Sequence, residues 1–125
     1  MLKRGAGMAD ASTTLAQLKD AVRQFVAVRA WEPFHSPKNL VMGLAVEAAE
    51  LMEPFLWLDL DASRRLTDDP AKREAVADEM ADVACYLLNL SNVLGIDLSD
   101  AVGAKLVKNA VKYPADQVRG RATFD

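Results

Sequence analysis

The sequence predicts an all-α fold, namely an oligomeric four-helix bundle, and three observations lead to it. Apolar residues recur at helical spacing in four segments, whereas alternating β-branched runs and Asn-Gly or Asp-Gly hairpin turns do not occur. Capping and stop residues mark the ends of these segments. The chain has 125 residues, of which 51% are hydrophobic, which is enough for one domain with a buried core. Short connections favour antiparallel neighbours, and the apolar helices favour self-association.

The first two predicted helices lie on either side of a Pro-rich loop. The first covers residues 14–29, with Ser12 or Thr13 as its N-cap. Ser36 caps the second helix, because its hydroxyl can accept a hydrogen bond from the first turn. Pro54 bends or ends this helix, since the proline ring clashes with the preceding turn.

The third predicted helix is the longest and is capped by Asp69. Gly95 ends it, and its apolar residues alternate at intervals of four and three, which is the pattern of a bundle seam: Val76, Met80, Val83, Leu87, Leu90 and Leu94. Residues 58–69, which precede it, are polar and predict a loop with at most a short helical turn. The fourth helix begins near residues 98–100, buries Val102, Leu106 and Tyr113, and ends at Pro114.

The chain is predicted to form one domain at residues 13–114, with a disordered leader at 1–12 and an irregular tail at 115–125. The leader lacks the apolar region of a secretory signal, and Met8 is an alternative native start. No apolar run reaches the roughly 18–20 residues that span a bilayer. Cys85 is the only cysteine, which favours the reducing cytoplasm. A net charge of −3 predicts no attraction to polynucleotides.

Two pairs of acidic residues carry the chemistry of the sequence. Glu47 and Glu50 lie on the second predicted helix, and Glu79 and Asp82 lie on the third, so each pair faces one side of its helix. If these helices are antiparallel neighbours, the four carboxylates converge in a half-buried cleft, where only cations relieve their repulsion. Mg²⁺ or Mn²⁺ fits such oxygen ligands best. The alternative is that both pairs lie on solvated faces, which the small residues around them disfavour.

Basic residues on the fourth helix could hold phosphates beside such a metal site. Lys105 and Lys112 lie on one side of this helix, and Asn109 lies between them and the apolar face. A carboxylate–Mg²⁺ cluster beside lysines is a common way of binding a polyphosphate. Lysines near a helix C-terminus also complement the helix dipole, so a purely structural role is an equal alternative.

Four ring side chains could form an aromatic wall for a nucleobase, or could belong to the core: Trp31, His35, Trp57 and Tyr86. Several other site types are excluded. The phosphate-binding and nucleophile-elbow motifs GxxxxGK[ST], GxGxxG and GxSxG are missing. One His and one Cys do not make a zinc site, and a di-iron bundle needs Glu-x-x-His on two helices.

The acidic residues also resemble a known family. Glu47-Ala-Ala-Glu50 followed by Glu79-Met-Ala-Asp82 is similar to the ExxE…ExxD signature of the MazG-like all-α nucleoside triphosphate pyrophosphohydrolases. Residues 31–40, 55–57 and 105–114 resemble the dCTP pyrophosphatase branch, and the resemblance covers roughly residues 15–115. It implies a bundle of the all-α NTP pyrophosphatase type, assembled as a homotetramer of paired dimers. It also implies Mg²⁺-dependent hydrolysis of dCTP or a related triphosphate between its α- and β-phosphates, giving nucleoside monophosphate and pyrophosphate as part of nucleotide house-cleaning.

The resemblance further implies a role for each matching residue. The metal ligands and catalytic acids would be Glu47, Glu50, Glu79 and Asp82, with Glu47 or Glu50 as general base. The substrate-binding residues would be Trp31, His35 and Trp57 at the base, Tyr86 and Asn109 at the sugar, Lys38, Lys105 and Lys112 at the phosphates, and Asn39. Tyr86 would disfavour a ribose 2′-hydroxyl.

One position departs from that branch. Its animal members have a His nine residues before the tryptophan, where this chain has Val22, so a different or looser base preference is expected. The competing interpretation from another class is a non-catalytic helical oligomerisation or adaptor module whose acidic faces are solvated.

Overall fold

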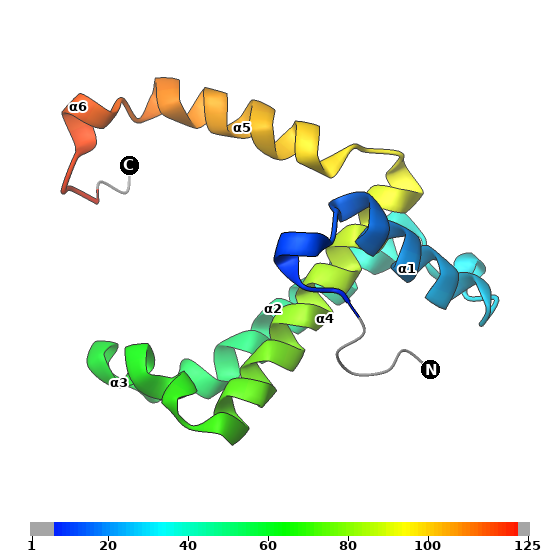
Figure 1. Cartoon of the computed structure of the whole chain (residues 1–125), viewed down its shortest axis with the longest axis horizontal. Coiled ribbons are helices and arrows are strands. Elements are labelled where there is room, and N and C mark those ends of the chain that lie inside the picture. The colour runs from blue at the N-terminus through cyan, green and yellow to red at the C-terminus, as the bar shows by residue number, and fades with distance from the viewer. Residues whose placement is uncertain (1–6, 123–125) are drawn as a thin grey trace. The chain divides into compact units, whose positions relative to one another are not determined.

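The computed structural model describes residues 7–122, and every regular element in that range is helical (Figure 1). The predicted all-α class is therefore confirmed, while the four-helix bundle and the oligomer stay predictions. The α-helices are α1 (Leu15–Ala27), α2 (Pro37–Met52), α3 (Leu60–Arg65), α4 (Pro70–Leu94), α5 (Leu98–Lys112) and α6 (Ala115–Val118). The 3₁₀ turns are Asp10–Ser12, Glu32–Phe34, Glu53–Phe55 and Leu66–Asp68.

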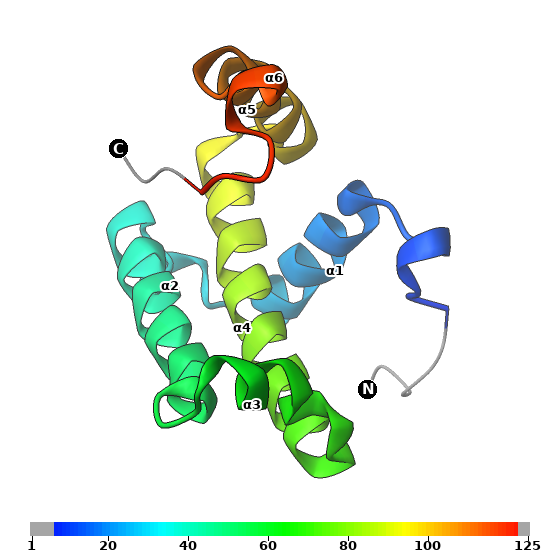
Figure 2. The same cartoon turned by 90° about the vertical axis from the view of Figure 1, so that its left-hand side faces the viewer.

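The helices belong to two compact units, one ending at Gly95 and the other beginning at Ile96. In the first unit, α2 packs along α4, and α1 packs against α4 as well (Figure 2). The long helix α4 is thus the element that the other helices of this unit share. Whether residues 13–114 act as a single domain stays a prediction.

The N-cap of α1 differs from the predicted one. The cap is Thr14, whose hydroxyl accepts from the backbone N–H of Gln17 at 3.2 Å, while the Gln17 side chain accepts from the Thr14 N–H at 2.8 Å. The prediction of Ser12 or Thr13 as the N-cap was wrong. Ser12 belongs to the preceding 3₁₀ turn, and only Thr14 has a Gln three residues later.

α1 ends at Ala27, two residues before its predicted end, whereas the ends marked by cap and stop residues are confirmed. The Ser36 hydroxyl accepts from the N–H of Asn39, and an oxygen of Asp69 accepts from the N–H groups of the first turn of α4. Gly95 ends α4 with φ 64°, a left-handed conformation that glycine adopts without strain. α2 stops at Met52, two residues before Pro54, and continues as a 3₁₀ turn. The segment 58–69, predicted as a loop with a short helical turn, is instead mostly helical, because α3 and the 3₁₀ turn Leu66–Asp68 together cover residues 60–68.

The core is made of one or two apolar residues from each packed element, and its buried members are Val26, Leu40, Leu66, Val76 and Leu88. The predicted seam on α4 is partly wrong. Met80 and Leu94 are 57% and 48% exposed, whereas Leu88 and its neighbour Asn89 are buried. Because α4 contacts both α1 and α2, its buried surface covers more than the one stripe that a single partner requires.

The second unit corrects two further predictions. Val102, Leu106 and Tyr113 are exposed rather than buried, because the other helix described in this unit, α6, has only one turn to cover α5. The segment expected to be irregular begins with that turn, since the carbonyl of Pro114 accepts from the N–H groups of Gln117 and Val118.

Parts of the predicted leader and tail, residues 1–6 and 123–125, lie outside the described residues. Within residues 7–122, the helices are too short or too polar to cross a membrane.

Candidate metal centre and adjoining pocket

Three of the four predicted acids meet between α2 and α4. Glu47, Glu50 and Glu79 each place one carboxylate oxygen within 4.8 Å of the other two. The first two are one turn apart on α2, and the third projects from α4. The geometry that the spacing predicted for neighbouring helices is therefore present for these three residues.

Two of these carboxylates are partly withdrawn from water. The Oε2 atoms of Glu47 and Glu79 are shielded from solvent, and neither has a hydrogen-bond partner among residues 7–122. A buried carboxylate oxygen without a partner is costly. The interpretation of solvated acidic faces therefore does not describe these two residues.

The pKa values reflect this environment. Burial, followed by the hydrogen bond and charge of Glu50 and then the charges of Asp82 and Glu79, raises the pKa of Glu47 to about 7. Burial, followed by the charges of Glu50 and Asp82, raises the pKa of Glu79 as well. A divalent cation would place a positive charge beside both carboxylates and so stabilise their ionised forms. Carboxylate oxygens within 4.8 Å of one another fit such an ion.

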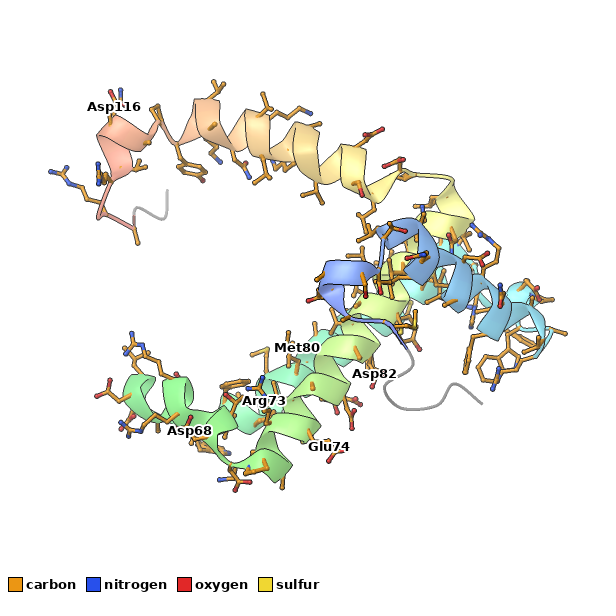
Figure 3. All side chains as sticks on the ribbon, viewed as in Figure 1. Asp68, Arg73, Glu74, Met80, Asp82 and Asp116 are labelled. Atoms are coloured by element: carbon orange, nitrogen blue, oxygen red, sulfur yellow. The ribbon has the colours of Figure 1, made fainter. Side chains whose placement is uncertain are left out.

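Asp82 lies beside this cluster and is not one of the three converging residues. It is exposed on α4, one turn after Glu79. Figure 3 shows Asp82 and Met80 projecting from α4 on different sides. The charge of Asp82 nevertheless contributes to the raised pKa values of Glu47 and Glu79. Its role as a fourth ligand stays a prediction.

The raised pKa values predict how the stability of the metal-free protein depends on pH. The folded state keeps a proton on Glu47 between the ordinary pKa of 4.5 and about 7, whereas the unfolded chain releases it. This stabilising contribution is complete below 4.5 and is lost as the pH rises to about 7. We expect the melting temperature in EDTA to fall between about pH 5 and pH 8. Circular dichroism melts measure this fall.

The matched control for the pH dependence is Glu47→Gln. Because glutamine does not titrate, the variant should show a smaller fall in melting temperature over the same range. Added Mg²⁺ should restore stability at the upper end of the range in the unmodified protein. A melting temperature that rises steadily with pH in EDTA, equally in both proteins, would contradict the assignment.

An aromatic pocket of about 160 Å³ lies in the same unit. The predicted residues Trp31, His35 and Tyr86 line it, and the rings of Trp31 and His35 meet edge to face at 6.2 Å and 70°. Phe25 extends this wall, with its ring 6.0 Å from that of Trp31. Val22, the position that departs from the resembled branch, also lines the pocket. The pocket thus offers ring faces and few polar groups, as a nucleobase requires.

A glycine joins this pocket to the acidic cluster. The ring of Tyr86 lies directly against Gly43 of α2, where a Cβ would come within 2.7 Å of Cζ and 2.8 Å of Cδ1. Gly43 is one turn before Glu47, and Tyr86 is one turn after Asp82. Tyr86 therefore lines the pocket, whose other residues belong to α1, α4 and the segment before α2, and also contacts α2, because a residue without a side chain lets its ring approach that helix.

The structure does not bring Trp57 into this pocket. Trp57 follows the 3₁₀ turn after α2, and its side chain is 95% exposed. Lys38 is exposed in the first turn of α2. The side-chain amide of Asn39 donates a hydrogen bond to the carbonyl of Phe34 at 3.0 Å, which holds the start of α2 against the preceding turn. The functional roles of these three residues stay predictions.

The remaining predicted residues belong to α5, in the second unit: Lys105, Asn109 and Lys112. The ammonium of Lys112 lies 5.2 Å from the ring centre of its neighbour Tyr113, and Asn109 is half-buried. Their roles at the phosphates and sugar stay predictions.

Sequence reasoning missed several residues that line the pocket, chiefly Cys85 and Asn89. The signal for Asn89 was available, because it follows Asp82 by seven residues and Tyr86 by three, which places all three on one face of α4. Burial, followed by the charge of Asp82, raises the pKa of the Cys85 thiol, so the thiol stays protonated at neutral pH.

Comparison with known proteins gives consistent matches. Residues 43–123 match the MazG-like family, and this range includes all four predicted acids. The chain is 35% identical over 109 residues to dCTP pyrophosphatase 1 of Bos taurus, covering 87% of this chain and 64% of the relative. It is 36% identical over 106 residues to dCTP pyrophosphatase 1 of Homo sapiens, covering 85% and 62%. The chain thus spans less than two thirds of the length of these curated relatives.

A solved structure is also similar. A pyrophosphatase from Archaeoglobus fulgidus DSM 4304 superposes with a TM-score of 0.73 at 38% identity, over 80% of this chain and 92% of that chain.

Proposed function

Because the chain belongs to the MazG-like family, we propose that it is a metal-dependent nucleoside triphosphate pyrophosphohydrolase, which cleaves between the α- and β-phosphates. The observation that carries this proposal is the convergence of Glu47, Glu50 and Glu79 within 4.8 Å. Two of these carboxylates have a shielded oxygen without a partner among residues 7–122, and a bound cation would satisfy both. Its relatives are named as pyrophosphatases, and the proposed class of reaction follows from them.

The metal would be Mg²⁺, with Mn²⁺ as a substitute. Glu47, Glu50 and Glu79 would hold it, and Asp82 would join them as the fourth carboxylate. Carboxylate oxygens are the ligands that these ions prefer. When bound, the cation would neutralise phosphate oxygens and make a water molecule more acidic.

The chain's own residues would position and deprotonate the attacking water. Glu47 or Glu50 accepts a proton from the water as its oxygen forms a bond to the α-phosphorus. The bond from the α-phosphorus to the bridging oxygen breaks, and pyrophosphate leaves. In the metal-free protein the pKa of Glu47 is raised to about 7, and a bound cation would lower it, which would keep the carboxylate in the form that accepts a proton.

The substrate would be a deoxynucleoside triphosphate, dCTP or a related nucleotide. Trp31 and His35 would hold the base, with Trp57 as a further aromatic contact, and Tyr86 would contact the sugar and disfavour a 2′-hydroxyl. On α5, Asn109 would contact the sugar, and Lys105 and Lys112 would hold phosphates together with Lys38. Asn39 would support this site. Val22 favours a base preference that differs from that of the animal relatives or is looser.

The active form would be a homotetramer of paired dimers in the cytoplasm, serving nucleotide house-cleaning. Large apolar side chains exposed on α2 and α5 support self-association, namely Val41, Met42, Val46, Met52, Val102, Leu106, Val107 and Val111.

A pyrophosphate-release assay tests the proposed reaction. The purified chain is incubated with each common nucleoside and deoxynucleoside triphosphate in Mg²⁺ and, separately, in EDTA. We expect release with at least one deoxynucleotide, highest for a pyrimidine, and no release in EDTA. An adaptor without a metal site would release none and would show no heat of Mg²⁺ binding by calorimetry.

A further inference from the structure

A buried amide on α4 holds the only histidine of the chain. Asn89 is 8% exposed, and its Nδ2 lies 2.9 Å from Nδ1 of His35, which is 54 residues earlier. A buried side-chain amide is costly unless it is hydrogen-bonded, so this contact contributes to the packing of α4. It also joins α4 to the short segment between α1 and α2.

The bond determines which ring nitrogen of His35 carries the proton. An amide nitrogen only donates, so Nδ1 of the imidazole accepts. A neutral imidazole that accepts at Nδ1 carries its proton at Nε2. His35 is therefore held as a donor at Nε2.

Two further contacts hold the ring in place. The edge-to-face contact with Trp31 restrains its plane, and the backbone N–H of His35 donates to the carbonyl of Glu32 at 3.1 Å. Both His35 and Asn89 line the aromatic pocket that Tyr86 also lines. An imidazole held by these three contacts offers a ligand in that pocket a hydrogen-bond donor at Nε2 and no acceptor.

We propose that Asn89 is a positioning residue, which fixes His35 as a hydrogen-bond donor and thereby selects nucleobases that offer an acceptor to it. Such an acceptor is a carbonyl oxygen or an unprotonated ring nitrogen. The choice of ligand rests on the proposed function, whereas the tautomer of His35 does not. A site that donates to one acceptor rejects a base that presents a donor there, because both groups would remain unpaired.

The tautomer can be observed directly, because His35 is the only histidine in the sequence. Long-range ¹H–¹⁵N NMR can be recorded on the ¹⁵N-labelled, ligand-free chain at a pH at which the imidazole ring is neutral. It then reports the protonation of both ring nitrogens of this one residue. We expect the proton on Nε2 in the unmodified protein. A proton on Nδ1, or two tautomers in rapid exchange, would overturn the proposal without the need for a variant.

Two variants sharpen this measurement. Asn89→Asp keeps the shape but only accepts, so at a pH at which the imidazole is neutral its single proton should move to Nδ1. Asn92→Asp is the matched control, since Asn92 lies one turn further along α4, bonds to Lys19 and Arg23, and should leave the proton on Nε2. An unchanged tautomer in Asn89→Asp would overturn the assignment.

Kinetics tests the selection of the base. In Asn89→Asp, KM for the preferred triphosphate should rise about tenfold, while kcat changes much less, because one hydrogen bond to the base is lost. The ranking of bases should shift toward those that present a donor. If the tautomer reverses but KM and the ranking do not change, the selective role is overturned. If the unmodified chain hydrolyses no triphosphate, the proposed function fails while the NMR result still decides the tautomer.

Discussion

Glu50→Gln should reduce the rate of pyrophosphate release by at least about 10³-fold, or roughly 4 kcal/mol of transition-state stabilisation. The substitution removes one of the three converging carboxylates, whose charge contributes most among the neighbouring charges to the raised pKa values of Glu47 and Glu79. Stability should change in the opposite direction. Because Glu50 raises the pKa values of Glu47 and Glu79 by repulsion, the metal-free variant near pH 8 should melt at the same temperature as the unmodified chain or higher.

The matched control is Asp78→Asn, which removes an exposed acid from α4 beside Glu79 and outside the converging group. It should retain activity within about twofold, as is usual for surface substitutions. Steady-state kinetics and thermal melts in EDTA measure both quantities. If Glu50→Gln stayed folded and kept most of its activity, the metal-binding role would be wrong.

Gly43→Ala should destabilise the protein by roughly 1–3 kcal/mol and lower kcat/KM by roughly 10²-fold. Alanine normally stabilises a helix interior relative to glycine by about 0.5–1 kcal/mol. Here its Cβ would overlap the ring of Tyr86, with Cζ at 2.7 Å. The ring has to move, and the pocket beside the acidic cluster changes shape. Denaturant unfolding and kinetics of the same preparation measure the two effects.

Two comparisons show whether the Tyr86 ring causes this cost, namely the same substitution in a Tyr86→Ala protein and an alanine at another helical glycine. In Tyr86→Ala the ring is gone, so adding Gly43→Ala should stabilise the protein by about 0.5–1 kcal/mol, which reverses the sign. Gly103→Ala is the matched control, because Gly103 lies within α5 and a Cβ there meets nothing within 4 Å. Equal costs of Gly43→Ala with and without the tyrosine would show that the ring is not the obstacle.

Local signals predicted the helices well, because caps and stops act within a few residues. Asp69 before Pro70 and Gly95 after Leu94 define the longest helix, and both ends agree with the structure. The exception is Thr14, since three consecutive hydroxyl residues could each cap a helix and the Gln at the third position decides. Burial was harder to predict. Leu88 and Asn89 are buried because α4 has two partners, and a period in one helix does not show how many neighbours it has.

In the candidate site too, positions within one helix could be predicted from the sequence, whereas contacts between helices could not. Residues three apart on one helix were placed correctly, and Glu79 met the α2 pair because the two helices are neighbours. Contacts that depend on the alignment of α2 against α4 were not predictable from spacing, including the approach of Tyr86 to Gly43 and the bond between Asn89 and His35. Trp57 illustrates the reverse case, where a plausible pocket residue is 95% exposed.

The most direct test of the proposed reaction is product analysis of the best triphosphate substrate in H₂¹⁸O with Mg²⁺. Attack on the α-phosphorus predicts nucleoside monophosphate and pyrophosphate in equal amounts, with ¹⁸O only in the monophosphate. Glu50→Gln should give neither product above background. Nucleoside diphosphate with inorganic phosphate, or ¹⁸O in the pyrophosphate, would contradict a pyrophosphohydrolase at this site.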